Sequence, residues 1–159
     1  MSNIQQIRQS IHQFVKRASE KHQAKRILDV APDEWAVVPQ FYKENVTTLN
    51  ITEGCDIKAD ICDCPQVASG SFDMIFCLEV LEHVYEPFKA VSELFRLLDT
   101  GGLLFISVPM FFEIHVPYPD CWRFTEMGLR YMFREHEVIE FNSVHPGPAP
   151  LHYTMVIRK

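Results

Sequence analysis

The feature that most constrains the fold is a strand–helix–strand pattern in the middle of the chain. Residues 71–78 and 103–108 are short apolar runs of the kind that form buried strands. Between them Pro87 opens a helix, which Gly101 and Gly102 are expected to end. The apolar face of this helix holds Phe88, Val91, Leu94, Phe95 and Leu98. Two apolar strands joined by an amphipathic helix predict a parallel strand pair, the unit of an α/β fold.

The rest of the chain continues this alternation. Further strands are predicted at residues 26–30, 46–51, 56–61, 138–141 and 152–157. Helices are predicted over residues 4–18, after Pro39 and after a Thr125 cap. We therefore expect an α/β domain with a largely parallel sheet, in which ligands bind beyond the C-terminal strand ends. No helix separates the last two strands, so they are predicted to pair as an antiparallel hairpin.

The length, composition and charge of the chain limit the classes of protein to which it can belong. The chain has 159 residues, 47% apolar and 23% charged, which suits one globular domain. Its net charge is −6, although residues 1–26 hold six Lys or Arg and one acid. The acidic remainder argues against general nucleic-acid binding, because phosphate contacts need clustered cations. The longest apolar run, residues 103–112, is too short to span a bilayer, and the N-terminus has no apolar signal core, so we expect a cytoplasmic protein.

Three segments carry a resemblance to a known family. Residues 71–84, SFDMIFCLEVLEHV, resemble the segment after the fourth strand of class I S-adenosylmethionine-dependent methyltransferases. Residues 86–109 resemble that family's next helix, Gly-Gly turn and fifth strand. Residues 117–125, PYPDCWRFT, are similar to a segment of methyltransferases that modify sugars and polysaccharides. The resemblance implies a Rossmann-like fold with a mostly parallel seven-stranded sheet, an antiparallel last strand and helices on both faces.

The same resemblance implies a function. It implies methyl transfer from S-adenosylmethionine to a small-molecule or glycan-type acceptor, at oxygen. A catalytically inactive methyltransferase-like binding or regulatory module is the alternative. A nicotinamide dehydrogenase is disfavoured, because no Gly-x-Gly-x-x-Gly follows the first strand.

We expect a single domain over residues 1–159. An N-terminal amphipathic helix would occupy residues 1–24, a cofactor-binding half residues 25–110 and an acceptor-side half residues 111–159. The apolar stripe of the first helix either packs on the domain or forms a dimer seam, so a homodimer or a larger biosynthetic partner is possible.

The family's first motif is an acid followed by a glycine loop. Here residues 29–34 read DVAPDE, without glycine. The resemblance implies that Asp29 reaches the amino group of the cofactor and that Ala31 and Pro32 form the tight turn. The missing glycine is one reason that the alternative of an inactive module stays open.

The second and third motifs add four predicted cofactor contacts. Asn50 stands where the family usually has a ribose-binding acid, and Ile51 follows it. Asp60 and Ile61 match the position whose acid accepts from the adenine amine and whose next residue packs on the ring. The alternative role of Asp60 is to cap a turn. Leu78, at the end of the fourth strand, completes the set.

A group of possible metal ligands follows the fourth strand. If a turn of helix begins there, Glu79, Glu82 and His83 share one face, and His115 is a possible fourth ligand. Some small-RNA and ubiquinone-pathway methyltransferases resemble this arrangement and use metals. Many sugar and small-molecule methyltransferases carry the same residues without metal. We therefore predict no metal, with this group as the alternative and internal hydrogen bonding of Glu82 and His83 as the simpler reading.

The acceptor is expected after the fifth strand. His115 is predicted to be the general base, because an imidazole titrates near neutral pH. Arg123 is predicted to orient a polar acceptor. The simpler reading is that Arg123 pairs with an acid and Trp122 anchors a loop.

Overall fold

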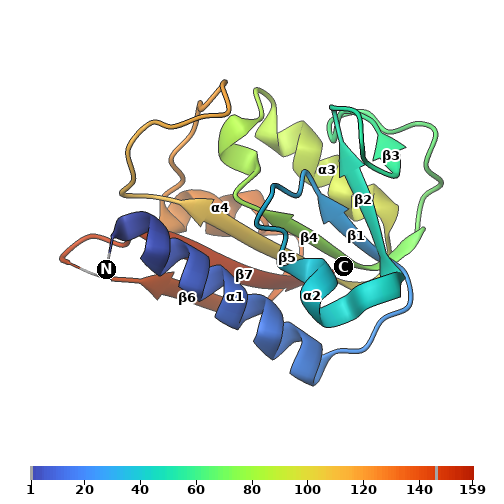
Figure 1. The fold of residues 1–159 in the computed structure, drawn as a ribbon, viewed down its shortest axis with the longest axis horizontal. Coiled ribbons are helices and arrows are strands. Elements are labelled where there is room, and N and C mark those ends of the chain that lie inside the picture. The colour runs from blue at the N-terminus through green and yellow to red at the C-terminus, as the bar shows by residue number, and fades with distance from the viewer. Residues whose placement is uncertain (1, 146) are drawn as a thin grey trace.

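Seven strands form one mixed sheet in the computed structural model, which describes residues 2–145 and 147–159. The strands are β1 Ile27–Val30, β2 Val46–Asn50, β3 Ile57–Lys58, β4 Phe72–Leu78, β5 Leu98–Pro109, β6 Glu137–Val144 and β7 His152–Arg158. Their order across the sheet is β3-β2-β1-β4-β5-β7-β6 (Figure 1). The pairs among β1 to β5 are parallel, and β7 runs antiparallel to both of its neighbours. This confirms the predicted mostly parallel seven-stranded sheet and the predicted terminal hairpin.

Helices cover both faces of the sheet. They are α1 Asn3–Lys21, α2 Val38–Tyr42, α3 Pro87–Leu97 and α4 Glu126–Met132, with short 3₁₀ helices η1 Lys43–Asn45 and η2 Leu81–His83. α1 and α2 pack on one face, and α3 and α4 on the other (Figure 1). Among the described residues, no helix combines the length and apolar character needed to cross a membrane.

The predicted N-terminal stripe forms α1. Ser2 caps this helix in a capping box with Gln5, which satisfies two backbone N–H groups that a helix start leaves open. The inner face buries Phe14 and Val15. The Phe14 ring lies 5.7 Å from that of Phe105 on β5, and burying a side chain of this size contributes about 1.5–3 kcal/mol.

Two details of α3 differ from the prediction. The helix ends at Leu97, and Gly101 and Gly102 lie inside β5. Gly102 is enclosed by backbone, since a Cβ there would meet the Asp73 carbonyl oxygen at 2.8 Å, so this glycine serves strand packing rather than helix termination. Phe88, in the first turn of α3, is 57% exposed and does not belong to the buried face of the helix.

Candidate functional site

Seven buried side-chain atoms without a hydrogen-bond partner mark one edge of the sheet. In the described part of the chain they belong to Asp29, Glu79, Glu82, Ser107 and His152. The first four lie at or just after the C-terminal ends of β1, β4 and β5. His152 opens the antiparallel β7 opposite the last residue of β5, which places it at the same edge. Buried polar groups are almost always partnered, so this is where a polar ligand is expected.

Asp29 is the candidate for a cationic group of a ligand. Its side chain is 3% exposed, and its Oδ2 has no hydrogen-bond partner. Burial, together with the charge of Asp33, raises the pKa of Asp29 to about 7. An ammonium group at this position would donate a hydrogen bond to the free oxygen and favour the ionised carboxylate, so the residue fits the amino group of a cofactor.

The turn after β1 is built without glycine. Ala31 has a φ of 50°, in the left-handed region that glycine favours, and its N–H donates to the Leu49 oxygen at 2.6 Å. The backbone bends at Ala31, whereas the hydrogen-bonded turn lies one residue beyond Pro32, where the Ala36 N–H donates to the Asp33 backbone oxygen at 3.1 Å. Ala31 adopts, with strain, a backbone conformation that glycine would adopt without strain.

The predicted adenosine contacts lie at the ends of β2 and β3. The Asn50 Oδ1 accepts from the Thr52 N–H at 3.3 Å, and Ile51 is exposed. The Asp60 Oδ1 accepts from the Cys62 N–H at 2.8 Å, so Asp60 caps a turn, as one of its two predicted roles required. A contact of Asp60 with a cofactor stays a prediction.

The hydrophobic members of the predicted cofactor site lie beside this turn and at the central edge. Ile61 is buried in the core. Leu78 is the half-buried last residue of β4. Both are placed to contact the apolar parts of a ligand bound across the strand ends, which stays a prediction.

Glu79 does not belong to a helical turn with Glu82 and His83, as the sequence predicted. Its φ is 54°, so the backbone changes direction there and η2 begins only at Leu81. The Glu79 Oε1 instead lies 3.5 Å from the His152 Nδ1.

Three of the four possible metal ligands come together. Glu82, His83 and His115 each offer a ligand atom, and these atoms lie within 4.8 Å of one another. Both oxygens of the buried Glu82 lack a hydrogen-bond partner. Burial and the charge of Glu79 raise the pKa of Glu82 well above its ordinary value. The His83 Nδ1 lies 2.8 Å from the Pro119 oxygen, which leaves its Nε2 on the side of Glu82. This donor set fits a divalent cation.

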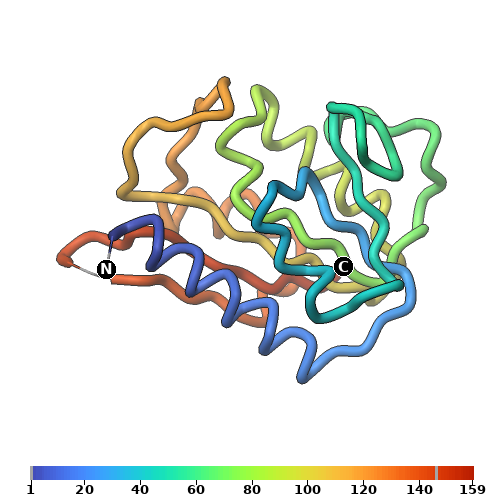
Figure 2. Tube along the Cα trace, viewed as in Figure 1, coloured from blue at the N-terminus to red at the C-terminus, as the bar shows by residue number. Residues whose placement is uncertain are grey.

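The loop after β5 brings His115 to this group. The backbone N–H of Cys121 donates to the backbone carbonyl oxygen of Glu82 at 2.7 Å, and the Trp122 indole N–H donates to the backbone oxygen of Val84 at 2.8 Å. The loop therefore lies beside the turn after β4, above the sheet edge (Figure 2). The His83 and His115 rings meet edge to face with centroids 5.0 Å apart. The anchoring role that the sequence suggested for Trp122 is present.

Arg123 is engaged entirely within the chain. Two of its N–H groups donate to the two oxygens of the buried Asp120 carboxylate. The other three donate to the backbone oxygens of Phe112, Glu113 and Trp122, so all five donors are used. Arg123 therefore has no free N–H group with which to make the predicted direct contact with an acceptor. Arg123 holds the pKa of Asp120 well below its ordinary value. Asp120 in turn lies 3.1 Å from the His115 Nδ1.

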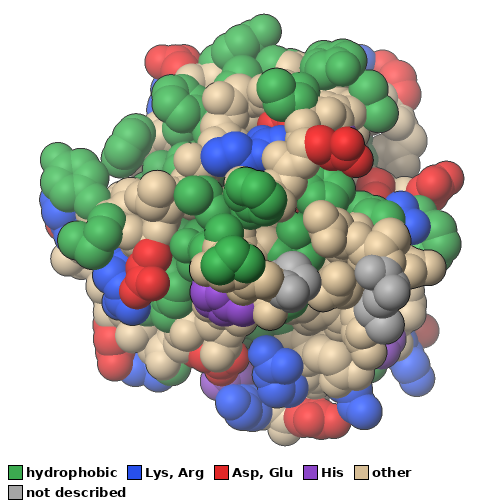
Figure 3. Space-filling view, turned by 90° about the vertical axis from the view of Figure 1, so that its left-hand side faces the viewer, with side chains coloured by type: hydrophobic (Ala, Val, Ile, Leu, Met, Phe, Trp, Pro, Cys, Tyr) green, Lys and Arg blue, Asp and Glu red, His purple; other side chains and the backbone are tan. Residues whose placement is uncertain are grey.

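Exposed apolar side chains surround this region. Phe111, Ile114, Val116 and Tyr118, all in the loop after β5, are each about seven-tenths exposed. Figure 3 shows apolar side chains gathering on this side of the molecule. Sequence reasoning found most of the edge but missed Ser107 and His152, because both read as ordinary members of strands. Only the sheet order reveals that they reach the same edge.

Comparisons with known proteins agree with this geometry. Residues 12–106, more than half of the chain, match a family model described as a methyltransferase domain. The chain is similar to the ubiquinone biosynthesis O-methyltransferase of Xanthomonas oryzae pv. oryzae, with 49% identity over 39 residues. That alignment covers 24% of this chain and 16% of the relative, so it spans only a small part of that protein.

Solved structures share the fold over nearly the whole chain. The [4+2]-cyclase SpnF superposes with a TM-score of 0.74 at 15% identity, covering 94% of this chain and 80% of that one. The 1,6-didemethyltoxoflavin-N1-methyltransferase of Burkholderia thailandensis, solved with 1,6-didemethyltoxoflavin and S-adenosylhomocysteine, superposes with a TM-score of 0.73 at 18% identity, covering 96% and 78%. At these identities the likeness establishes the fold.

Proposed function

The chain belongs to the class I methyltransferase family, and from this premise we propose that it transfers a methyl group from S-adenosylmethionine to a hydroxyl of a small-molecule or glycan-type acceptor. The observation that carries the proposal is the collection of unpartnered buried polar atoms at the C-terminal edge of the sheet. In parallel α/β sheets this edge is where ligands bind.

Asp29 binds the amino group of the cofactor, because its buried free oxygen lacks a cationic partner. Asn50 ends β2 and Asp60 follows β3, where the ribose and the adenine would extend. The sulfonium is an activated donor, so the protein's main task is to align the acceptor oxygen, the methyl carbon and the sulfur. The C–S bond breaks as the O–C bond forms, and the bonding pair stays on sulfur.

His115 takes the proton that the acceptor hydroxyl loses. Asp120 faces its Nδ1 at 3.1 Å, which orients the ring and leaves the Nε2 for the acceptor. Arg123 acts as a positioning residue through Asp120. This replaces the direct acceptor contact predicted from the sequence.

A second candidate is a metal-assisted methyltransferase, favoured by the two unpartnered oxygens of the buried Glu82. Glu82, His83 and His115 would hold the cation. A bound divalent cation would supply Lewis acidity that lowers the pKa of an acceptor hydroxyl. In this case His115 is a ligand rather than the base.

Calorimetric titration with S-adenosylhomocysteine tests the cofactor. Saturable binding to the wild-type chain is expected, and its absence would reject the methyltransferase proposal. Binding without turnover on any acceptor would support the inactive binding module.

The role of His115 is tested on turnover. His115→Ala is expected to keep its affinity for S-adenosylhomocysteine and to lose about 10²–10⁴-fold in rate. Under the metal alternative, Glu82→Gln and His83→Ala are equally damaging and a chelator abolishes turnover. Normal turnover by His115→Ala would contradict both mechanisms.

A further inference from the structure

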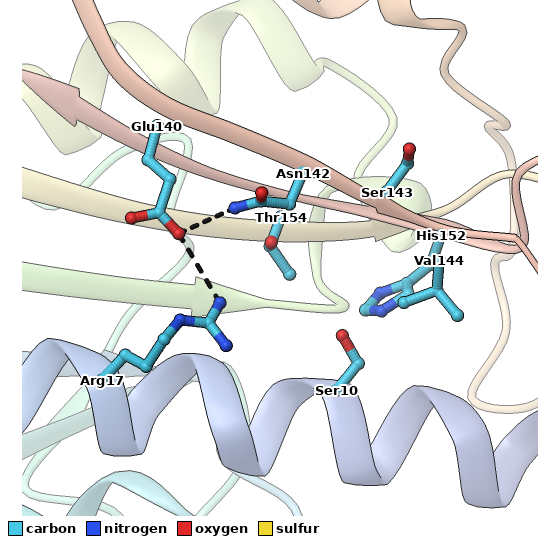
Figure 4. Close-up of a pocket in the computed structure, with 8 residues that line it drawn as sticks. All are labelled: Ser10, Arg17, Glu140, Asn142, Ser143, Val144, His152 and Thr154. Carbon is cyan, nitrogen blue, oxygen red and sulfur yellow. Dashed lines mark hydrogen bonds and ion pairs between the residues drawn. The ribbon is translucent and has the colours of Figure 1, made fainter.

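A polar cavity of about 280 Å³ lies between α1 and the strands β6 and β7, on the face of the sheet rather than beyond the strand ends (Figure 4). It is close to the lower limit of ordinary ligand sites, so it suits a small molecule. Its polar lining comes from three elements: Ser10 and Arg17 of α1, Glu140, Asn142 and Ser143 of β6, and His152 and Thr154 of β7.

The cavity exists because a polar row crosses the sheet beneath α1. Asn142, Thr154 and Ser107 are register neighbours on β6, β7 and β5. α1 places Ser10 at the cavity, and one turn later Phe14 fills the same layer with apolar contacts. A polar row under a helix contributes less to a core than apolar packing does, so its presence needs another explanation.

His152 supplies an independent indication of a ligand. The residue is fully buried, and neither ring nitrogen has a hydrogen-bond partner in the described part of the chain. In Figure 4 its ring projects from β7 into the space between the sheet and α1, toward Ser10. Its Nδ1 lies 3.5 Å from the Glu79 Oε1 at the sheet edge. The inner end of the cavity therefore adjoins the C-terminal edge of the sheet, at the residue that follows β4.

The charges of the cavity offset one another. Arg17 lies 3.5 Å from Glu140, whose Oε1 also accepts from the Asn142 amide at 2.7 Å. The uncharged groups that the cavity offers to a ligand include the Ser10 and Thr154 hydroxyls and the His152 imidazole, which can donate and accept without carrying a fixed charge. Such groups suit the hydroxyl groups of a ligand.

We propose that this cavity binds a neutral, hydroxyl-rich small molecule of about one sugar ring, as the acceptor or a part of it. The inference rests on the proposed function, because it takes the methyl donor to lie at the adjoining edge. Ser10, Thr154 and His152 hydrogen-bond the ring hydroxyls, and His152 places the acceptor beside Glu79.

Nuclear magnetic resonance of the nitrogen-15-labelled full chain tests the site. The probes are D-glucose, D-galactose, D-mannose and L-rhamnose, each titrated separately, and inorganic phosphate. At least one sugar is expected to shift the amide signals of Asn142 and Thr154 saturably, and phosphate is expected to leave them unchanged. Absence of a saturable shift with every sugar, or a saturable shift with phosphate, would overturn the proposal.

A cavity-filling variant locates the binding. Ser10→Phe is expected to lower the affinity for the sugar by about tenfold or more, and His152→Asn is expected to lower this affinity as well. Gln9→Phe, on the exposed face of the same helix, is the matched control and is expected to bind like wild type. Equal sugar binding by wild type and Ser10→Phe would contradict the assignment.

The affinity of these variants for S-adenosylhomocysteine, measured by calorimetry, separates the two proposals. If the wild type binds S-adenosylhomocysteine but no sugar, only the cavity assignment fails. If it binds a sugar but no S-adenosylhomocysteine, only the methyl-transfer proposal fails.

Discussion

Asp29 is a single residue whose ionisation links stability to the cofactor site. Its ordinary pKa of 3.8 applies in the unfolded chain, whereas burial raises the folded value to about 7. The unfolded chain therefore loses this proton first as the pH rises, and the stability of the free protein falls across this window and stays low above it.

Asp29→Asn removes this ionisation. Relative to wild type, the variant is expected to gain stability between about pH 4 and pH 7, with each pKa unit corresponding to about 1.36 kcal/mol at most. Urea unfolding without cofactor, at pH 4.5 and pH 8, measures the difference. A difference that does not change with pH would show that Asp29 is not the titrating group. The same variant is expected to lose affinity for S-adenosylhomocysteine.

Ala31 carries backbone strain that a single substitution relieves. Its φ of 50° disfavours a residue with a Cβ. Ala31→Gly is expected to raise the free energy of unfolding by about 1 kcal/mol in urea unfolding. Ala36→Gly is the control, since Ala36 does not have a positive φ and gains only unfolded-state freedom. Destabilisation of Ala31→Gly by as much as the control would contradict strain at this turn.

At the scale of elements, the loop after β5 is held by the Arg123–Asp120 ion pair and by single hydrogen bonds rather than by regular structure. Arg123→Lys removes the planar fork and most of its five donated hydrogen bonds. We expect a loss of about 2 kcal/mol in the free energy of unfolding and faster proteolytic cleavage within residues 111–122. Turnover should fall while affinity for S-adenosylhomocysteine is kept, because His115 loses its support.

Arg134→Lys is the matched control for this experiment. Arg134 pairs with Glu135 at the surface, where ion pairs contribute little, so a change within about 0.5 kcal/mol is expected. Equal effects of the two substitutions would mean that Arg123 is only a surface residue.

The elements that could be predicted from the sequence are those with a local pattern. Apolar runs located the strands, and the stripe of α1 and the Thr125 cap located two helices. The change of direction at Glu79 could not be predicted, because it depends on a positive φ at a residue that suits a helix equally well. His152 reached the site only through the sheet order, in which β7 lies beside β5. Long-range pairing of this kind leaves no local trace in one sequence.

At the scale of the whole molecule, the sheet separates two tasks. Its two faces carry the cores under α1 and α3, which supply stability through apolar burial. Its C-terminal edge carries buried polar atoms that no part of the described chain satisfies, which costs stability. A protein built in this way is expected to gain stability when a ligand occupies that edge.

Thermal unfolding measures this gain. At about 100 times its dissociation constant, S-adenosylhomocysteine adds about 2.7 kcal/mol to the free energy of unfolding, and for a chain of this size that raises Tm by roughly 5–10 °C. Asp29→Asn should show a much smaller rise at the same concentration, because it lacks the carboxylate that binds the amino group. Ala36→Gly, which lies outside the proposed contacts, should show the full rise. An equal rise in wild type and Asp29→Asn would place the cofactor elsewhere, since a ligand stabilises the fold only through groups that it contacts in the folded state.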